Sequence, residues 1–301
     1  MGHGSWNSSS WNSYKTSKGI TQKSTVHDIY TSKNLKDSLN PKGVKFRESC
    51  DSVDHPNSTA VIIGLDVTGS MGYLSEEIAK NSLNTLINEV YTRKPIDDPH
   101  LMFMAIGDAY CDKSPLQVTQ FEADVRIGKQ LMDIWFESGG GGNGGESYLA
   151  AWYFAARHTK IDCYDKRKKK GFLFTIGDEC NHKRLTKEQI KKFFGDDVER
   201  DLTADELLKE VSRRYEVFHL IVGNYQYHGS LEDWKETLGE RAMVVTDHTK
   251  IPEIIESTME VMNGKSANTV AAQWDGSTSV VVKTAIGGLT NVNKMNDLIE
   301  F

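Results

Sequence analysis

The sequence has few cysteines, and none of them are paired in a recognisable motif. Four occur among 301 residues, all far apart in the chain: Cys50, Cys111, Cys163 and Cys180. This spacing contains no C-x-x-C pair, so it excludes the common zinc-binding and dithiol motifs and does not resemble a disulfide framework. We therefore expect reduced thiols and a cytoplasmic protein.

Long apolar runs and an excess of positive charge are also absent. No apolar stretch approaches the roughly 20 residues that a membrane-spanning helix needs, and the opening segment MGHGSWNSSS lacks an apolar signal region. The formal net charge is −6, whereas general nucleic-acid binders carry a basic face. We expect neither a membrane nor a nucleic acid as partner.

What the chain does contain is the composition of a globular protein, with 38% hydrophobic and 26% charged residues. It divides into three regions. Residues 1–58 are rich in Ser, Asn and Lys, which predicts an extended polar arm with a short helix near 26–30. The charged stretch 47–56 is either a solvated linker or a segment over the functional edge of the domain. Residues 59–262 form the main domain, and residues 263–301 a C-terminal segment that packs on it.

Within the main domain, short apolar runs alternate with segments of helical spacing. Five runs predict strands, at 60–65, 101–106, 171–176, 217–222 and 242–245, and 115–121 predicts an antiparallel edge strand. Amphipathic spacing predicts helices at 76–91, 125–136, 148–158, 187–194, 204–215, 231–238 and 252–262. This alternation indicates an α/β fold: a doubly wound, mostly parallel sheet of about six strands with helices on both faces, as in Rossmann-like domains.

Oxygen-bearing side chains follow several of these strands. In an open parallel sheet, ligands bind beyond the carboxyl ends of the strands. The residues expected there are Asp66, Thr68, Ser70, Asp108, Asp178 and Glu179, together with Asn143, Glu146 and Ser147 from the glycine-rich loop GGGGNGGES. Carboxylates and hydroxyls are the ligands that a hard divalent cation such as Mg²⁺ prefers. The sequence therefore predicts a metal site at this edge.

The first of these segments resembles the metal-ion-dependent adhesion site (MIDAS) of von Willebrand factor type A (vWA) domains. That family's D-x-S-x-S motif appears as Asp66-Val67-Thr68-Gly69-Ser70, with Thr68 keeping the hydroxyl. Its distal aspartate corresponds to Asp178, although Gly177 intervenes where the family has Thr or Ser directly before the acid. The resemblance covers residues 59–262 and implies Asp66, Thr68, Ser70 and Asp178 as metal ligands.

The glycine-rich loop departs from the family, which supplies a Thr ligand there. This loop has no Thr, so Glu146 is the preferred substitute, with Asn143 and Ser147 next. Asp108 is expected as a direct or outer contributor and Glu179 at the rim. The resemblance further implies binding rather than catalysis: Mg²⁺ or Mn²⁺ holds a carboxylate of another protein, as in assemblies with AAA+ ATPases. The chain has no Walker A motif of its own.

An enzyme of another class remains as the alternative. Phosphotransferases of the haloacid dehalogenase type also place an aspartate after the first strand, in a D-x-[DT]-G-[TS] pattern that Asp66–Ser70 satisfies. Asp66 would then attack a phosphoryl group and Asp178 would hold Mg²⁺. That interpretation gives the glycine-rich loop no role and lacks an obviously placed Lys, so the adhesion-site interpretation is preferred.

Overall fold

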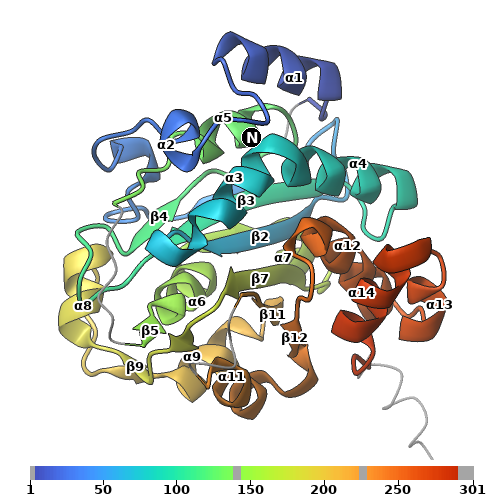
Figure 1. Cartoon of the computed structure of the whole chain (residues 1–301). Helices are drawn as coiled ribbons and strands as arrows, with labels where there is room; N and C mark the ends of the chain where they lie inside the picture. Colours follow the sequence, from blue (N-terminus) through green and yellow to red (C-terminus); the bar gives the residue numbers. More distant parts are fainter. Residues whose placement is uncertain (1–3, 138–143, 224–228, 291–301) are drawn as a thin grey trace, which may run out of the picture.

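The computed structural model describes residues 4–137, 144–223 and 229–290 and shows an α/β fold around one six-stranded sheet (Figure 1). The strands lie in the order β12-β11-β7-β2-β3-β4. Their bounds are β2 Thr59–Asp66, β3 Pro99–Ile106, β4 Leu116–Val118, β7 Gly171–Gly177, β11 Tyr215–Ile221 and β12 Ala242–Val244. All pair in parallel except β4, which is antiparallel to β3. The predicted fold class and all six predicted strands are confirmed.

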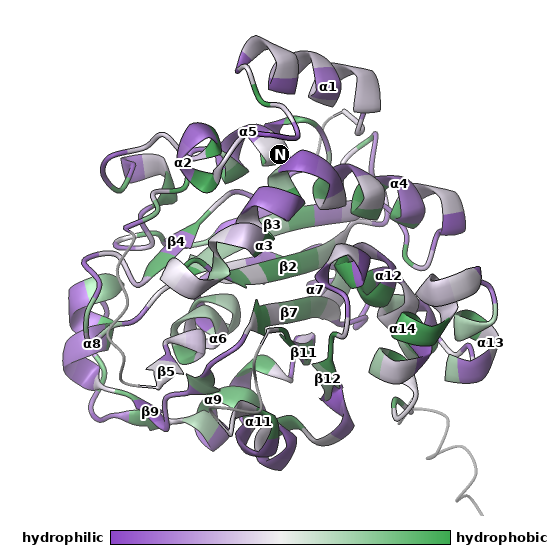
Figure 2. Ribbon diagram, viewed as in Figure 1, coloured by the Kyte–Doolittle hydropathy of each residue, from purple (hydrophilic) through white to green (hydrophobic). Residues whose placement is uncertain are grey.

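Helices cover both faces of this sheet, because each central strand is apolar on both sides. In β2, Val61, Ile63 and Leu65 belong to one hydrophobic cluster, and Ala60 and Ile62 belong to the other. The first cluster is covered by α3 (Gly72–Glu77), α4 (Leu83–Arg93), α5 (Arg126–Leu131) and α12 (Ile251–Met262). The second is covered by α6 (Tyr148–Arg157), α8 (Lys187–Phe193), α9 (Ala204–Val211) and α11 (Ser230–Leu238). Figure 2 shows apolar central strands and a largely hydrophilic α8.

Three predicted helices differ in extent from the structure. The helix predicted at 204–215 ends at Val211, and Tyr215 begins β11. The segment 76–91 belongs to a longer helical stretch in which a π-helical piece, Ile78–Ser82, joins α3 to α4. The segment 125–136 is helical only as far as Leu131. Beyond that residue the side chain of Gln117 on β4 binds the backbone of Trp135, donating to its carbonyl at 2.7 Å and accepting from its N–H at 2.9 Å. These bonds replace the helical ones, which the apolar spacing could not reveal.

The amino-terminal region is more structured than an extended arm. It contains α1 (Ser8–Ser17), capped by the side chain of Asn7, and α2 (Val26–Ile29), which overlaps the predicted short helix. Trp11 on α1 is completely buried and lies over Gly128 of α5, where any Cβ would overlap the indole ring. Gly128 thus leaves the space on the main domain into which Trp11 of the amino-terminal region packs. α2 contacts α3, where the N–H of Val26 donates to Glu76 at 2.6 Å.

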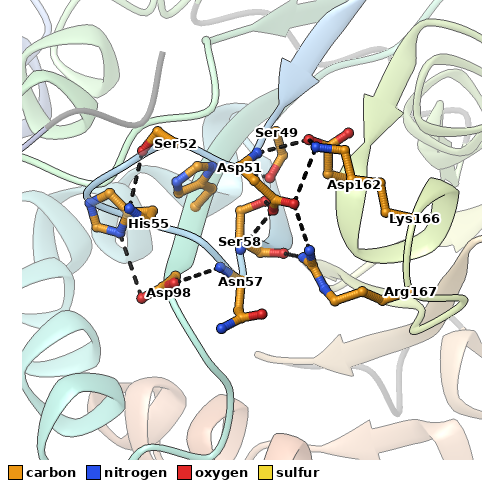
Figure 3. A network of polar contacts seen from close by, with 11 residues as sticks. Ser49, Asp51, Ser52, His55, Asn57, Ser58, Asp98, Asp162, Lys166 and Arg167 are labelled. Atoms are coloured by element: carbon orange, nitrogen blue, oxygen red, sulfur yellow. Dashed lines mark hydrogen bonds and ion pairs between the residues drawn. The ribbon is translucent and has the colours of Figure 1, made fainter.

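The charged stretch 47–56 contacts residues at the amino ends of β2 and β3, among them Ser58 and Asp98 (Figure 3). The predicted ligand edge lies at the carboxyl ends of these strands. The short strand β1 (Arg47–Ser49) pairs with β6 (Thr159–Ile161), and the N–H of Asn57 donates to Asp98 just before β3 at 2.8 Å. The hypothesis that this stretch covers the functional edge is therefore wrong. Its charges are used in a structural network instead.

The C-terminal segment forms two helices, α13 (Ala267–Ala271) and α14 (Gly276–Ile286), both packed against α12. Residues 280–286 are therefore helical. The remaining small elements are β5 Gly145–Glu146, α7 Asp162–Asp165, β8 Cys180–Asn181, β9 Arg184–Leu185 and β10 Leu202–Thr203. In the described part of the chain, no helix combines the length and apolarity needed to cross a membrane.

Candidate functional site

Asp66 ends β2 inside the protein, with none of its surface exposed. Its Oδ1 accepts two hydrogen bonds from Thr68, one from the backbone N–H at 2.8 Å and one from the hydroxyl at 2.6 Å. The tight loop therefore holds the carboxylate and the Thr68 hydroxyl against each other, as the D-x-T spacing predicts. Because the Thr68 hydroxyl donates its hydrogen to Asp66, its oxygen lone pairs remain available to another group.

Ser70 lies on the short 3₁₀ turn Gly69–Met71 that leads into α3, and it is exposed at the surface. Asp66 and Thr68 are buried a few residues earlier, so the motif runs from the interior to the solvent. A ligand held by this loop would be reached from outside the sheet edge.

A residue that the sequence analysis missed completes the environment of Asp66. Tyr148, the first residue of α6, is fully buried and donates its hydroxyl to Asp66 Oδ2 at 3.1 Å. Its ring passes across β7 at Gly177, where a Cβ would overlap the Tyr148 hydroxyl and lie 3.1 Å from the Asp66 Cβ. The glycine that interrupts the family pattern before Asp178 thus makes room for this contact. No motif in the sequence identifies Tyr148.

Asp178 and Glu179 follow β7 directly, at the same edge as Asp66. Gly223, at the end of the neighbouring β11, adjoins Asp178: a Cβ there would lie 3.5 Å from the Asp178 Cβ. The backbone carbonyl of Glu179 accepts a bond from the indole N–H of Trp234 at 3.0 Å. The bend after β7 is therefore anchored, and it brings Asp178 close enough for its charge to act on Asp66.

Glu146 lies on the two-residue strand β5, just before α6 begins. This strand pairs in parallel with β8, placing Glu146 opposite Asn181. Glu146 is only 5% exposed, and its Oε2 has no hydrogen-bond partner among the described residues. Asn143 lies outside the residues that the structure describes. The charges of Asp66 and Asp108 act on the Glu146 carboxylate, which places it near these acids.

Asp108 and Ser147 serve mainly to hold the loops together. The Ser147 hydroxyl accepts the N–H of Ala109 at 2.8 Å, which ties the start of α6 to the loop after β3. Asp108 is buried and its Oδ1 binds His182 Nε2 at 2.8 Å and the N–H of Tyr110 at 3.1 Å. Through these contacts Asp108 and Ser147 support the loops at the edge. Asp108 also positions His182, which follows β8.

The electrostatics of the edge are those of crowded carboxylates. Burial, the largest cause, raises the pKa of Asp66, the bonds from Thr68 oppose that rise, and the charge of Asp178 adds to it. Burial likewise raises the pKa of Glu146, and the charges of Asp66 and Asp108 raise it further. In the described part of the chain, the neighbouring charges that shift the pKa values of these two groups are thus those of other acids.

The donors suit an oxygen-liganded cation. Among the described residues, no three His, Cys, Asp or Glu side chains are grouped closely enough to hold a metal by themselves. An ion at this edge would therefore depend on the hydroxyls of Thr68 and Ser70 as well as on the carboxylates. All these atoms are oxygens, which favours Mg²⁺ or Mn²⁺ over metals that require nitrogen or sulfur ligands. The partnerless Glu146 Oε2 fits the same requirement.

No protein-family model matches the sequence, and a search of curated proteins finds no match. Solved structures similar to this chain include the pilus adhesin SpaC from Lactobacillus rhamnosus GG, at 10% identity and a TM-score of 0.43 over 73% of this chain and 32% of that one. Another is proximal thread matrix protein 1 from the mussel byssus, at 9% and 0.40 over 71% and 48%. A von Willebrand factor type A protein from Catenulispora acidiphila is similar at 11% and 0.36 over 76% and 51%. The chain spans a third to a half of these structures' lengths.

Proposed function

We propose that the carboxyl edge of the sheet is a divalent-cation-dependent protein-interaction site, and that the protein is a binding module rather than an enzyme. Asp66, Thr68, Ser70 and Asp178 would hold Mg²⁺ or Mn²⁺, with Glu146 beside them. The partner would be a protein that presents an acidic residue to the ion, for example a subunit of an AAA+ ATPase assembly. The bound ion would supply the positive charge that joins two acidic surfaces.

The observation that carries this proposal is the uncompensated charge at the end of β2. Asp66 is fully buried, it accepts hydrogen bonds from Thr68 and Tyr148, and the neighbouring charge that raises its pKa is that of Asp178. Buried charges in proteins are normally paired or bound to a metal. A cation held by Asp66 and by the hydroxyls of Thr68 and Ser70 would pair the buried carboxylate. Its position would be the carboxyl edge of the sheet, where parallel sheets bind their ligands.

The phosphotransferase alternative is less well supported by the same contacts. It gives the loop that carries Glu146 no role, so it does not explain why this buried carboxylate has an Oε2 without a hydrogen-bond partner among the described residues. We therefore retain the binding function as the proposal.

The proposal is tested first with the metal alone. Mn²⁺ is titrated into the wild type and into Asp66→Ala, and free Mn²⁺ is measured by electron paramagnetic resonance. We expect one site in the wild type and at least a tenfold weaker one in Asp66→Ala, because the central carboxylate is lost. Glu256→Gln, which alters a buried acid on α12 far along the chain from these loops, is the matched control and should bind as the wild type does.

The second step concerns the partner. Proteins captured by the immobilised wild type in Mg²⁺ should be released by EDTA and should not be captured by Asp66→Ala. Capture that persists in EDTA, or a wild type that does not bind Mn²⁺, would contradict the proposal.

A further inference from the structure

Part of the amino-terminal region lies along the outside of the helical stretch that begins at the candidate site. Residues 6–30, here called the strap, contain α1 and α2 and share a hydrophobic cluster with α3 and α4 on one side of the sheet (Figure 1). The strap donates hydrogen bonds along that stretch, from Ser8 to Asn88 at 3.0 Å, Trp6 to Asn84 at 3.2 Å, Gln22 to Asn81 at 2.9 Å, Lys15 to the Lys80 carbonyl at 2.6 Å, Val26 to Glu76 at 2.6 Å and Tyr30 to the Ser75 carbonyl at 3.1 Å. It therefore runs broadly antiparallel to the helical stretch.

The π-helical piece Ile78–Ser82 in the middle of this stretch has a reason in the sequence. Buried apolar side chains face the core on either side of it: Leu74, Ile78 and Ala79 towards the start, and Leu83, Leu86, Ile87 and Val90 towards the end. A continuous α-helix would rotate these two groups apart by roughly 100°, the turn of one residue. The wider π turn takes up the extra residue and interrupts the regular helical bonds, and Lys15 of the strap binds the Lys80 carbonyl within it.

The strap also holds the short helix that follows the candidate loop. α3 begins at Gly72, two residues after Ser70, and a Cβ at Gly72 would lie 3.6 Å from Val26 of α2. Glu76 connects the two sides, because its Oε1 accepts the N–H of Val26 at 2.6 Å and its Oε2 accepts the Lys80 Nζ at 3.1 Å. α3 is thus fixed by the strap on its outer side and joined to α4 only through the π turn.

The attachment of α1 depends largely on one side chain. Trp11 is the buried residue of α1 and fills the space at Gly128, whereas the rest of this helix is exposed or half-buried. α1 has 10 residues, and isolated helices shorter than about 12–15 residues are marginal in water. Loss of the Trp11 indole is therefore expected to release α1 while the sheet and its covering helices remain folded.

We propose that the strap locks α3 across a hinge at the π turn, and that its release loosens the loop Asp66–Ser70 and weakens ligand binding there. π turns inside α-helices occur frequently at functional sites, and this one separates the part of the helix next to the loop from the part packed under α12. The effect on binding rests on the proposed function. The inference adds a means of regulating that site from the amino terminus.

The test compares the wild type with Trp11→Ala, Lys15→Met and Lys15→Arg. Trp274→Ala is the matched control, because Trp274 lies between α13 and α14 and donates from Nε1 to Ser257 of α12 at 2.8 Å. Its loss should release a different terminal segment. Exchange of backbone amide hydrogens is measured by mass spectrometry in EDTA, which reports on the lock without any metal. Mn²⁺ affinity is then measured by electron paramagnetic resonance.

In Trp11→Ala we expect the amides of residues 69–82 to exchange about tenfold faster than in the wild type and Mn²⁺ to bind about threefold or more weakly. Lys15→Met should change both readouts in the same direction but less, because only one bond of the strap is lost. Lys15→Arg, which keeps a donor, should restore both towards the wild type. Trp274→Ala should speed exchange in residues 267–286 and leave residues 69–82 and Mn²⁺ affinity unchanged.

Unchanged exchange of residues 69–82 in both Trp11→Ala and Lys15→Met would overturn the inference. So would faster exchange there at unchanged Mn²⁺ affinity, because the loop would then bind the ion whether or not α3 is held. An equal rise in exchange throughout the domain in both variants would show that the strap serves general stability, which also contradicts the lock. If Trp11→Ala does not fold, the two Lys15 variants provide the comparison.

Failure of the proposed function gives a different result. A wild type that binds no Mn²⁺ would overturn the metal-dependent site and its regulation by the strap. Faster exchange of residues 69–82 in EDTA, confined to the strap variants, would still support the lock on α3.

Discussion

At the amino ends of β2 and β3, Asp51 accepts hydrogen bonds from Arg167 at 2.7 Å, Lys166 at 3.3 Å and Ser58 at 2.8 Å (Figure 3). Burial raises the pKa of Asp51, but the bonds from Arg167 and Ser58 outweigh that effect and bring it to about 2. This acid is paired with cations and joins residues 47–58 to the domain.

At the other end of the same strand, Asp66 accepts its bonds from the neutral groups of Thr68 and Tyr148, and its pKa is raised. Asp66 has no exposed surface whereas Asp51 is partly buried, so the two acids differ in depth of burial as well as in their partners. An acid that is compensated by basic side chains stabilises the fold, whereas an acid left uncompensated at a ligand-binding edge is available for function. Three predictions bear on this contrast.

The largest effect is expected from Asp51→Ala. It would leave Arg167 without its carboxylate in a half-buried position and remove the acceptor for Ser58, at a cost of about 3 kcal/mol in the free energy of unfolding. Urea denaturation at pH 7 measures this. Asp197→Ala, which removes an exposed ion pair with Lys191, should change stability by less than about 0.5 kcal/mol. A loss below about 1 kcal/mol for Asp51→Ala would show that the network is not structural.

Gly177→Ala should have the next largest effect, because its methyl group would overlap the Tyr148 hydroxyl. We expect a loss of about 2 kcal/mol in unfolding free energy and weaker Mn²⁺ binding, since Tyr148 would be displaced from Asp66. In Tyr148→Phe the overlapping hydroxyl is absent, so the double variant should recover part of the lost stability. Gly72→Ala, whose methyl would meet Val26 at an ordinary 3.6 Å, is the control. Additive losses in the double variant would contradict the role given to Gly177.

The third prediction concerns Glu256 on α12, a buried acid whose pKa is raised like that of Asp66. Among the described residues, neither of its oxygens has a hydrogen-bond partner. Burial, the largest cause, raises its pKa to about 8, and the charge of Glu260 adds to that rise. Arg93 and Lys265 oppose it, and Glu89 adds to it.

Because the folded state holds this proton more tightly than the unfolded state does, its contribution to stability is complete below pH 4.5 and is lost as the pH rises towards 8. Glu256→Gln should remove that loss, so its stability relative to the wild type should increase from pH 5 to pH 8. Urea denaturation at the two pH values, in EDTA, measures the difference. An equal difference at both values would contradict the prediction.

The sequence alone identified the strands because each is a short apolar run bounded by turn residues, and their alternation with amphipathic helices indicated a mostly parallel sheet. It also located Asp66, Thr68 and Asp178, since the carboxyl ends of parallel strands must meet at one edge. These features depend on local pattern and on rules of topology, both of which a single chain displays.

Other features depend on contacts between distant segments. Trp11 is buried because Gly128, more than a hundred residues later, leaves space for it. The helix of α5 ends early because Gln117 binds the Trp135 backbone. Neither contact produces a periodic pattern in the sequence. The sequence therefore predicts an extended amino-terminal arm and a helix at 125–136 that is longer than α5.

The sequence by itself determined that the carboxylate of Asp66 and the hydroxyls of Thr68 and Ser70 lie at the end of the first apolar strand of a doubly wound sheet. Only the tertiary structure decided which acids remain uncompensated: it brought Arg167 and Lys166 to Asp51, and Tyr148 and other acids to Asp66 and Glu146. The physical reason is that the pKa of a buried acid depends on the charges and donors within a few ångströms of it. Those neighbours come from strands and loops that are far apart in the chain.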